Sequence, residues 1–391
     1  MKILIYARDW APSVGGVQTI VKTLADGLAD GLADWSSKHS EQAIEVTLLT
    51  QTPAGSMKDS QLPYRVVRRP GFIDFIREIR RADVVHLAGP TILPLIIGYL
   101  LRKPTVIEHH GFQAICPNGQ LLYEPTQTPC PGFFMTRQYG ECIRCNSKLG
   151  RITSVKMWML TFPRRWLSQR VSANIVPTSW LGSLLQLNRL KTIFHGLQPR
   201  EFLPETRVTS SVPIFVFLGR LVSTKGVRVL IEAAGLLKAK HREFEVRIIG
   251  DGPERQELEK LVRDLRIQSC VQFRGYVPAE RLAENLAAST AVVMPSLGGE
   301  VFGLVAAENM QMGKIVIASD IGALSEVLGD AGMTFATGDA EDLARCMDAI
   351  IVDPLIAEQT GKKAGRRIAE VFAADQMVTE HLQVYQESSS H

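Results

Sequence analysis

Two glutamates eight residues apart, Glu300 and Glu308, carry the clearest chemical signal in the chain. Glu300 follows a glycine pair at Gly298-Gly299, and Glu308 lies in the apolar helix pattern that comes next. An apolar strand pattern precedes the glycines. A strand, a glycine loop and a helix N-terminus form a binding place for an anion at the end of a parallel sheet. Two carboxylates beside a phosphate site indicate a ligand with both hydroxyls and phosphates, so we expect a nucleotide-sugar.

A pair of cations surrounds a second glycine turn. An apolar strand pattern over residues 214–218 ends at Gly219-Arg220, and Lys225 opens the following helix pattern. Arg220 can donate two parallel hydrogen bonds to phosphate oxygens, whereas Lys225 adds a mobile point charge. A further strand pattern ends at Gly250. These turns suit a diphosphate group.

A third glycine turn lies near the N-terminus. Gly15 and Gly16 stand between a strand pattern and a helix pattern. Because glycine has no Cβ, the backbone at such a turn can approach a phosphate closely. A plain tight turn explains the same two residues at least as well.

Two adjacent histidines, His109 and His110, follow a strand pattern over residues 104–108. The carboxyl end of a parallel strand lies at the edge of the sheet where ligands bind. Imidazole there can hydrogen-bond a hydroxyl group or transfer a proton near neutral pH. The alternative is a histidine that is satisfied within the core or faces solvent.

Four of the six cysteines, Cys116, Cys130, Cys142 and Cys145, fall within a stretch of thirty residues. Cys142 and Cys145 supply two thiolates on one turn, which is half of a tetrahedral zinc site, and the other two could complete it. The alternative is a loop whose thiols only pack. Disulfides are disfavoured because we expect a reducing cytoplasm.

Length and apolar patterning favour a globular chain of two domains. With 391 residues, the chain is too long for one ordinary hydrophobic core. No signal-peptide pattern opens it. The most apolar segment, residues 91–101, is far shorter than the roughly 20 residues that a membrane span requires. We therefore expect a cytoplasmic protein.

The net charge is only +4, but residues 137–170 carry eight basic residues against one acidic residue, with aromatic residues between them. One interpretation of this stretch is a helix face that is exposed to solvent. The alternative is a docking surface for anionic lipid headgroups at the inner face of a membrane, or for a lipid-phosphate acceptor. No nucleic-acid-binding motif accompanies the charge, so we expect no nucleic-acid partner.

Alternating strand and helix patterns must position the residues described above, and they favour parallel sheets with helices on both faces. A polar, proline-containing run over residues 198–213 is typical of an interdomain linker. Ser179 is a candidate helix cap. The sequence predicts strands over residues 2–6, 45–49, 83–87, 104–108, 173–176, 191–194, 214–218, 244–249, 271–274 and 315–318, and helices over residues 93–101, 152–170 and 376–385.

Four motifs, taken in their order along the chain, resemble those of the family 4 glycosyltransferases, a group of retaining GT-B enzymes. The resemblance covers nearly the whole chain, and the cysteine-rich stretch resembles an insert found in a subset of these enzymes. It implies an α/β architecture of two Rossmann-like domains whose parallel sheets face each other across a cleft. The motifs are Gly15-Gly16-Val17, Gly219-Arg220-Leu221 with Lys225-Gly226, Gly250-Asp251-Gly252-Pro253, and the element from Glu300 to Glu308.

The resemblance also implies a domain plan and an activity. Residues 1–195 are expected to form an acceptor domain and residues 196–371 a donor domain, with a terminal helix in residues 372–391 packing back onto the first. The implied reaction moves a sugar from a UDP- or GDP-sugar to a glycan or lipid-linked acceptor in cell-surface polysaccharide or glycolipid biosynthesis. A GT-B sugar-nucleotide epimerase and a non-catalytic nucleotide-sugar-binding protein remain the alternatives.

Each candidate residue receives a role from the resemblance. Arg220 and Lys225 bind the donor diphosphate and stabilise the leaving group. Glu300 binds hydroxyls of the donor sugar, Glu308 binds the ribose hydroxyls, and His110 lies beside the sugar. Further donor-binding positions are Gly15, Gly16, Gly219, Gly250, Phe302, Gly303 and Leu304.

The implied mechanism differs from that of a retaining glycosidase, which uses a carboxylate nucleophile at the anomeric carbon. Here both Glu300 and Glu308 are assigned to hydroxyls. This agrees with the same-face, leaving-group-assisted attack commonly proposed for the family, in which a phosphate oxygen takes the acceptor's proton. We expect retention of configuration and no catalytic metal, because cationic side chains replace the ion.

Overall fold

The computed structural model describes residues 1–13, 15–30, 44–55, 57–199 and 212–390. It divides the chain into two compact units. Unit 1 comprises Met1–Gly119, Gly132–Pro199 and Phe372–His391, and unit 2 comprises Gln120–Pro131 and Arg200–Val371. Most of the predicted linker, residues 200–211, lies outside the described residues.

Unit 1 is built on a seven-stranded parallel sheet with the strand order β3-β2-β1-β4-β5-β8-β9. Its central strands are buried along their length because helices cover both faces, so they read as continuous apolar runs. The strands are β1 (Lys2–Ala7), β2 (Glu45–Thr50), β3 (Arg65–Arg68), β4 (Val84–Ala88), β5 (Thr105–Glu108), β8 (Ala173–Val176) and β9 (Leu190–Thr192).

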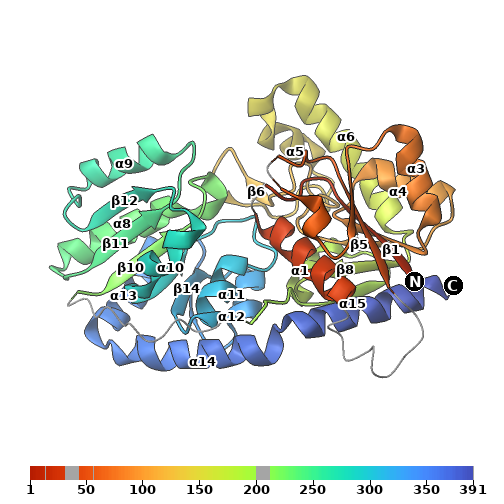
Figure 1. Cartoon of the computed structure of the whole chain (residues 1–391). Helices are drawn as coiled ribbons and strands as arrows, with labels where there is room; N and C mark the ends of the chain where they lie inside the picture. Colours follow the sequence, from red (N-terminus) through yellow and green to blue (C-terminus); the bar gives the residue numbers. More distant parts are fainter. Residues whose placement is uncertain (14, 31–43, 56, 200–211, 391) are drawn as a thin grey trace. The chain divides into compact units, whose positions relative to one another are not determined.

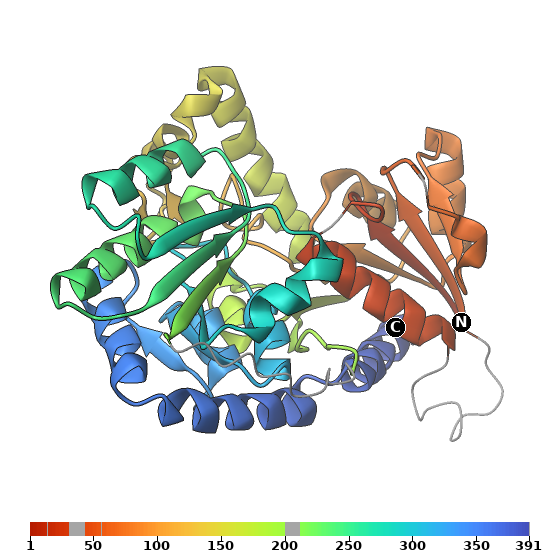
Figure 2. The same cartoon turned by 60° about the vertical axis from the view of Figure 1, so that its left-hand side comes forward.

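The helices of unit 1 form a layer on each side of this sheet. Apolar residues of α3, α4 and α6 share one core cluster with alternate residues of β1 and β4. The α1 and α15 helices lie side by side on the sheet (Figure 1 and Figure 2). The helices are α1 (Gly16–Asp30), α3 (Phe72–Arg81), α4 (Ile92–Leu100), α5 (Tyr139–Cys145), α6 (Arg151–Ser168), α7 (Ser179–Leu185) and α15 (Ala374–Ser389), with the 3-10 turns η1 (Asp59–Gln61) and η2 (Ser147–Leu149).

Unit 2 contains a six-stranded parallel sheet with the order β12-β11-β10-β13-β14-β15 and a separate antiparallel hairpin, β6-β7. The strands are β10 (Ile214–Leu218), β11 (Glu245–Ile249), β12 (Val271–Gly275), β13 (Ala291–Met294), β14 (Ile315–Ser319), β15 (Met333–Phe335), β6 (Leu122–Tyr123) and β7 (Thr128–Pro129).

The core of unit 2 gathers alternate strand residues with apolar residues of α8, α9 and α13. The α11, α12 and α14 helices pack around β14. The helices are α8 (Val227–Ala239), α9 (Arg255–Asp264), α10 (Ala279–Ala287), α11 (Leu304–Gln311), α12 (Gly322–Leu328), α13 (Ala340–Val352) and α14 (Leu355–Val371), with the 3-10 turn η3 (Ser223–Lys225).

Each sheet has a point where the strand order reverses, and ligands of open α/β sheets bind outside the carboxyl ends of the strands at such points. In unit 1 the chain starts at β1, which pairs with β2 on one side and β4 on the other. In the six-stranded sheet of unit 2, the first strand along the chain is β10, which pairs with β11 on one side and β13 on the other. The candidate residues follow these strands.

The strands that periodicity predicts are present, with ends that differ by a few residues at most. The sequence analysis predicted neither β3 nor α3. The predicted cap at Ser179 is wrong by one residue. Thr178 is the N-cap of α7, and its hydroxyl accepts a hydrogen bond from the Leu181 N–H at 3.3 Å. Among the described residues, no helix combines the length and apolarity that crossing a membrane requires.

Candidate functional site

Two of the predicted side chains meet in unit 2 although they are 75 residues apart in the chain. Lys225, in η3, forms an ion pair with Oε1 of Glu300, which follows β13. The Ser296 hydroxyl donates to the same oxygen at 2.9 Å. Glu300 is only 7% exposed, so its carboxylate is held by an ammonium group and a hydroxyl group in a largely dry place.

Backbone contacts hold the Lys225 turn against the Glu300 loop. The Thr224 carbonyl accepts hydrogen bonds from the N–H groups of Leu297 at 2.8 Å and Gly298 at 3.3 Å. Gly226 has a φ of +60°, and a Cβ added there would lie 1.9 Å from the Pro295 carbonyl oxygen. Only glycine allows this approach. The position of the Lys225 side chain is therefore set by the loop that carries Glu300.

A second close approach joins the ends of β10 and β11. The Gly219 N–H donates to the Ile249 carbonyl at 3.0 Å, and the Gly250 N–H donates to the Gly275 carbonyl at 2.8 Å. A Cβ on Gly250 would lie 1.8 Å from the Gly219 carbonyl oxygen. Arg220 follows directly and is exposed. The glycines thus bring three strand ends together beside an accessible guanidinium group.

The amide groups expected to bind phosphate lie at the start of α11. Gly303, which follows the buried Phe302, is the N-cap in a left-handed conformation, and the helix begins at Leu304. The first N–H groups of a helix have no partner within it and attract anions. Glu308 lies on the same helix and is half-buried. This end of unit 2 offers hydrogen-bond donors, two cations and two carboxylates.

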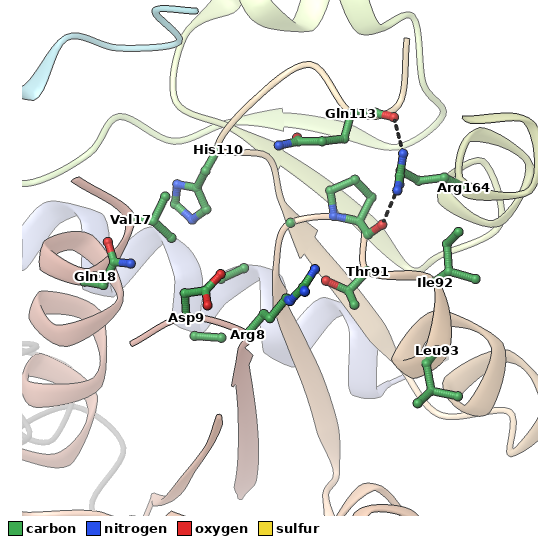
Figure 3. Close-up of a pocket in the computed structure, with 14 residues that line it drawn as sticks. Arg8, Asp9, Val17, Gln18, Thr91, Ile92, Leu93, His110, Gln113 and Arg164 are labelled. Carbon is green, nitrogen blue, oxygen red and sulfur yellow. Dashed lines mark hydrogen bonds between the residues drawn. The ribbon is translucent and has the colours of Figure 1, made fainter. Parts of the chain in front are cut away.

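Unit 1 contains a cavity of 480 Å³ at the carboxyl ends of β1 and β4, where its strand order reverses (Figure 3). Val17 and Gln18, at the start of α1, form one side of it, and Arg164 of α6 forms another. The Arg164 guanidinium donates to the carbonyl groups of Pro90 and Gln113, each at 3.2 Å. The lining side chains include Arg8, Asp9, Val17, Gln18, Thr91, Ile92, Leu93, His110, Gln113 and Arg164.

Of the two adjacent histidines, His110 lines this cavity and His109 does not. Nε2 of His109 lies 2.9 Å from the Asn174 side-chain oxygen, and the ring is fully buried. Burial lowers the pKa of His109 to about 4, so this ring is neutral at physiological pH. His110 stacks on His195 with ring centroids 5.2 Å apart.

Sequence reasoning missed a buried carboxylate behind His110. Glu108, the last residue of β5, is fully buried, and Nε2 of His110 lies 3.4 Å from its Oε2. Three more histidines surround it, namely His86, His195 and His381. Burial raises the pKa of Glu108, but the neighbouring imidazoles outweigh this effect and hold the pKa well below its usual value. The only signal in the sequence for this buried carboxylate was an acidic residue within an apolar strand pattern.

The structure does not show the predicted zinc site at the four clustered cysteines. All six cysteines are described, and none forms a disulfide. Cys130 belongs to unit 2, whereas the other three belong to unit 1. Within the part of the chain that the structure describes, no group of three potential metal ligands includes a thiol. The Cys116 thiol lies 3.0 Å from the side-chain oxygen of Asn118 instead. The zinc prediction for these thiols thus has no support in the structure.

Comparison with known proteins finds similarity to glycosyltransferases over part of the chain. Residues 200–367 match the family model described as glycosyl transferases group 1. The chain is 29% identical over 154 residues to an alpha-D-kanosaminyltransferase of Streptomyces kanamyceticus, which is 39% of this chain and 40% of that protein. It is 35% identical over 179 residues to a D-inositol 3-phosphate glycosyltransferase of Pseudarthrobacter chlorophenolicus, which is 44% of this chain and 40% of that protein. The matches therefore span well under two thirds of these relatives.

Solved structures show the same fold over nearly the whole chain. The structure of Anabaena HepE in complex with UDP-glucose superposes with a TM-score of 0.71 at 17% sequence identity, covering 98% of this chain and 99% of that one. The architecture is thus that of the GT-B glycosyltransferases, with parallel sheets in two Rossmann-like units.

Proposed function

We propose that the protein is a retaining glycosyltransferase that moves a sugar from a nucleotide-diphosphate-sugar to a glycan or lipid-linked acceptor. The observation that carries this proposal is the Lys225–Glu300 pair beside the start of α11, inside the matched domain. The pair combines a cation that can bind a phosphate group with a buried carboxylate that can accept hydrogen bonds from hydroxyl groups. HepE, which shares the fold, was crystallised in complex with UDP-glucose, and this supports a UDP-sugar as the first donor to test.

In this proposal each side chain acts on a part of the donor. Arg220 and Lys225 stabilise the negative charge that develops on the diphosphate as the glycosidic bond breaks. Glu300 accepts hydrogen bonds from the sugar hydroxyls, and Glu308 accepts them from the ribose. Neither carboxylate attacks the anomeric carbon, so the acceptor approaches from the face of the leaving group and a phosphate oxygen takes its proton. The two cations provide the counter-charge, and the scheme needs no catalytic metal.

The two parts of the chain then have separate tasks. Residues 196–371 hold the donor, and residues 1–195 with the terminal segment 372–391 hold the acceptor. The 480 Å³ cavity of unit 1 supports this division because it combines charged and apolar side chains at a sheet edge. His110 on its wall is placed to hydrogen-bond a sugar hydroxyl. Gly15 and Gly16 directly precede Val17, which lines the same cavity, and in this proposal their backbone approaches a phosphate.

A thermal-shift screen tests donor binding. We expect one of the UDP-, GDP-, ADP- and TDP-sugars to raise the melting temperature, since a ligand at one hundred times its Kd adds about 2.7 kcal/mol to the stability of the folded state. The Lys225→Ala variant should bind that donor roughly 10–100-fold more weakly, because a hydrogen bond to a charged group contributes about 1.5–3 kcal/mol. Lys260→Ala, which removes an exposed lysine from α9, is the matched control. An unchanged shift in Lys225→Ala contradicts the diphosphate assignment.

We further propose that the face formed by α4 and α6 binds anionic membrane lipid, where a lipid-linked acceptor is presented. The two helices pack together, with Tyr99 and Trp166 in edge-to-face contact at 5.6 Å. α6 contains no acidic residue, and the Arg170 guanidinium lies 3.8 Å from the centre of the Trp166 ring. The exposed apolar side chains are Leu93, Ile96, Tyr99, Leu100, Ile152, Val155, Met159, Phe162 and Trp166.

Aromatic and aliphatic side chains beside cations suit a membrane interface. We expect the protein to sediment with vesicles of phosphatidylcholine mixed with phosphatidylglycerol more than with phosphatidylcholine alone, and salt to weaken the difference. Ile152→Ser together with Leu100→Ser should reduce the bound fraction. Val352→Ser, which changes an exposed apolar residue of α13, is the control. Equal sedimentation with both kinds of vesicle contradicts the proposal.

A further inference from the structure

Three fully buried side chains of unit 1, His86, Glu108 and His381, direct their polar atoms at one another. His86 comes from β4, Glu108 from the end of β5 and His381 from α15. The Nε2 atoms of His86 and His381 lie 3.3 and 3.8 Å from Oε2 of Glu108. Neither imidazole makes a well-aligned hydrogen bond to the carboxylate, whose two oxygens have no hydrogen-bond partner among the described residues.

The other ring nitrogens are held in place. Nδ1 of His381 lies 2.8 Å from the Met377 carbonyl oxygen, and Nδ1 of His86 lies 2.8 Å from the Tyr385 hydroxyl. A carbonyl group only accepts hydrogen bonds, so Nδ1 of His381 carries a hydrogen. In the neutral ring, Nε2 then presents its lone pair to the carboxylate. Metal-binding histidines are oriented in this way, with the second nitrogen hydrogen-bonded to a carbonyl or other polar group.

A lone pair that faces a carboxylate in a dry site is repelled unless a cation lies between them. At a tetrahedral zinc ion with bonds of roughly 2.0–2.1 Å, neighbouring ligand atoms are roughly 3.3–3.4 Å apart. The 3.3 Å distance between His86 and Glu108 agrees with this spacing, and the 3.8 Å distance to His381 is slightly longer.

We propose that His86, Glu108 and His381 bind a divalent transition metal ion, with Zn²⁺ as the ion that their donors fit best. Two neutral imidazoles and a carboxylate form a donor set that zinc accepts, and one buried water completes a tetrahedron. Complete burial gives the ion a structural role. It ties α15 to the ends of β4 and β5 behind the cavity that His110 lines. This site is separate from the cysteine-rich stretch.

The test begins with the full-length protein. Elemental analysis should find about one zinc per chain. Chelation should lower the melting temperature, and Zn²⁺ alone should restore it, because the ion binds only the folded state. Cobalt substitution reports the ligand type, since thiolate ligands produce a charge-transfer band in the near ultraviolet and nitrogen and oxygen ligands do not. We expect visible d–d bands without that thiolate band.

Three variants assign the ligands. Tyr385→Phe keeps the ring and removes only the hydroxyl beside His86, so zinc affinity should fall by roughly 10–100-fold. His381→Gln should reduce it further. His109→Gln changes an equally buried histidine, which directly follows Glu108 at the end of β5. This substitution should leave zinc affinity unchanged. The inference is overturned if the chelated protein takes up neither Zn²⁺ nor Co²⁺, or if the cobalt spectrum shows thiolate ligation. The wild-type measurements decide the question even where His381→Gln does not fold.

Discussion

At the scale of single residues, the main result is the contact between Lys225 and Glu300. The sequence analysis assigned one to phosphate and the other to sugar hydroxyls, but it had no means to place them together. The ion pair and the Ser296 hydroxyl hold the Glu300 carboxylate in one orientation in a site that is only 7% exposed. A carboxylate prepared in this way accepts hydroxyl hydrogen bonds with little reorganisation.

Glu308 provides a prediction at the same scale. It lies on α11, half-buried, one turn beyond the start of the helix. If it accepts hydrogen bonds from the ribose, Glu308→Ala should weaken donor binding by about 1.5–3 kcal/mol, measured by calorimetry. A donor whose ribose lacks the 2′ and 3′ hydroxyls should bind wild type and variant alike. An equal loss with both donors would show that Glu308 acts on another part of the ligand.

At the scale of elements, glycines decide how closely the loops of unit 2 approach. Gly226, at the start of α8, lies against the Pro295 carbonyl with a left-handed φ of +60°. Gly235 lies within the same helix, where an added Cβ would be 3.4 Å from a Leu265 side-chain carbon, an ordinary contact. The same glycine-to-alanine substitution should therefore have different effects on stability at Gly226 and at Gly235.

We expect Gly226→Ala to lower the free energy of unfolding by more than about 1 kcal/mol and to reduce donor affinity, since the Lys225 turn must move. Gly235→Ala should leave stability unchanged or raise it by up to about 1 kcal/mol, because alanine favours the helix. Chemical denaturation and donor titration of both variants check this pair. A Gly226→Ala variant as stable and as active as Gly235→Ala would mean that the close approach is not needed.

A second element-scale feature is the loop between β1 and α1. Arg68, on the edge strand β3, donates to the carboxylate of Asp59 at 2.7 and 2.8 Å and to the Ala11 carbonyl at 2.9 Å. Its guanidinium also lies 5.3 Å from the centre of the Trp10 ring. The missed strand β3 therefore supports the turn that leads to Gly15 and Gly16.

The Asp59 carboxylate makes this support dependent on pH. Hydrogen bonds from Arg68 lower the pKa of Asp59 below its value in the unfolded chain, which is about 3.9. Its stabilisation is therefore complete above that pH and is lost as the pH falls through the folded-state pKa. Asp59→Asn should cost about 1–3 kcal/mol at neutral pH and progressively less below pH ~4, by urea denaturation. Asp74→Asn, at an exposed ion pair, is the control with little effect. A pH-independent cost would contradict this account.

At the scale of the whole molecule, the sequence predicted more of the fold than of the site. Apolar strands such as Ile214–Leu218 are readable because a strand covered on both faces must be apolar throughout. The glycine turns were readable because positive φ and close approach exclude other residues. The cluster around Glu108 could not be predicted, because its histidines come from β4, the segment after β5, the segment after β9 and α15. Only the folded chain brings them together.

The same limit applies to the cysteines, whose predicted zinc site the structure does not show. Spacing along the chain places Cys142 and Cys145 on one turn of α5, but it says nothing about Cys130, which belongs to the other unit. Metal sites depend on ligands that the fold brings together in space, and sequence spacing indicates only those on one local turn. Several of the residues that are predicted to bind the donor, such as Arg220 and Glu300, follow strands of the same sheet, and parallel strands end at a common edge.

The most direct test of the proposed activity is product analysis without an acceptor. The donor that raises the melting temperature is incubated with wild type and with Lys225→Ala, and the products are identified by nuclear magnetic resonance. We predict slow release of nucleoside diphosphate and free sugar by the wild type, reduced by roughly 10²–10³-fold in the variant. A donor that binds but stays intact would identify a nucleotide-sugar-binding protein, and conversion to an isomeric nucleotide-sugar would identify an epimerase. Either result would contradict the glycosyltransferase proposal.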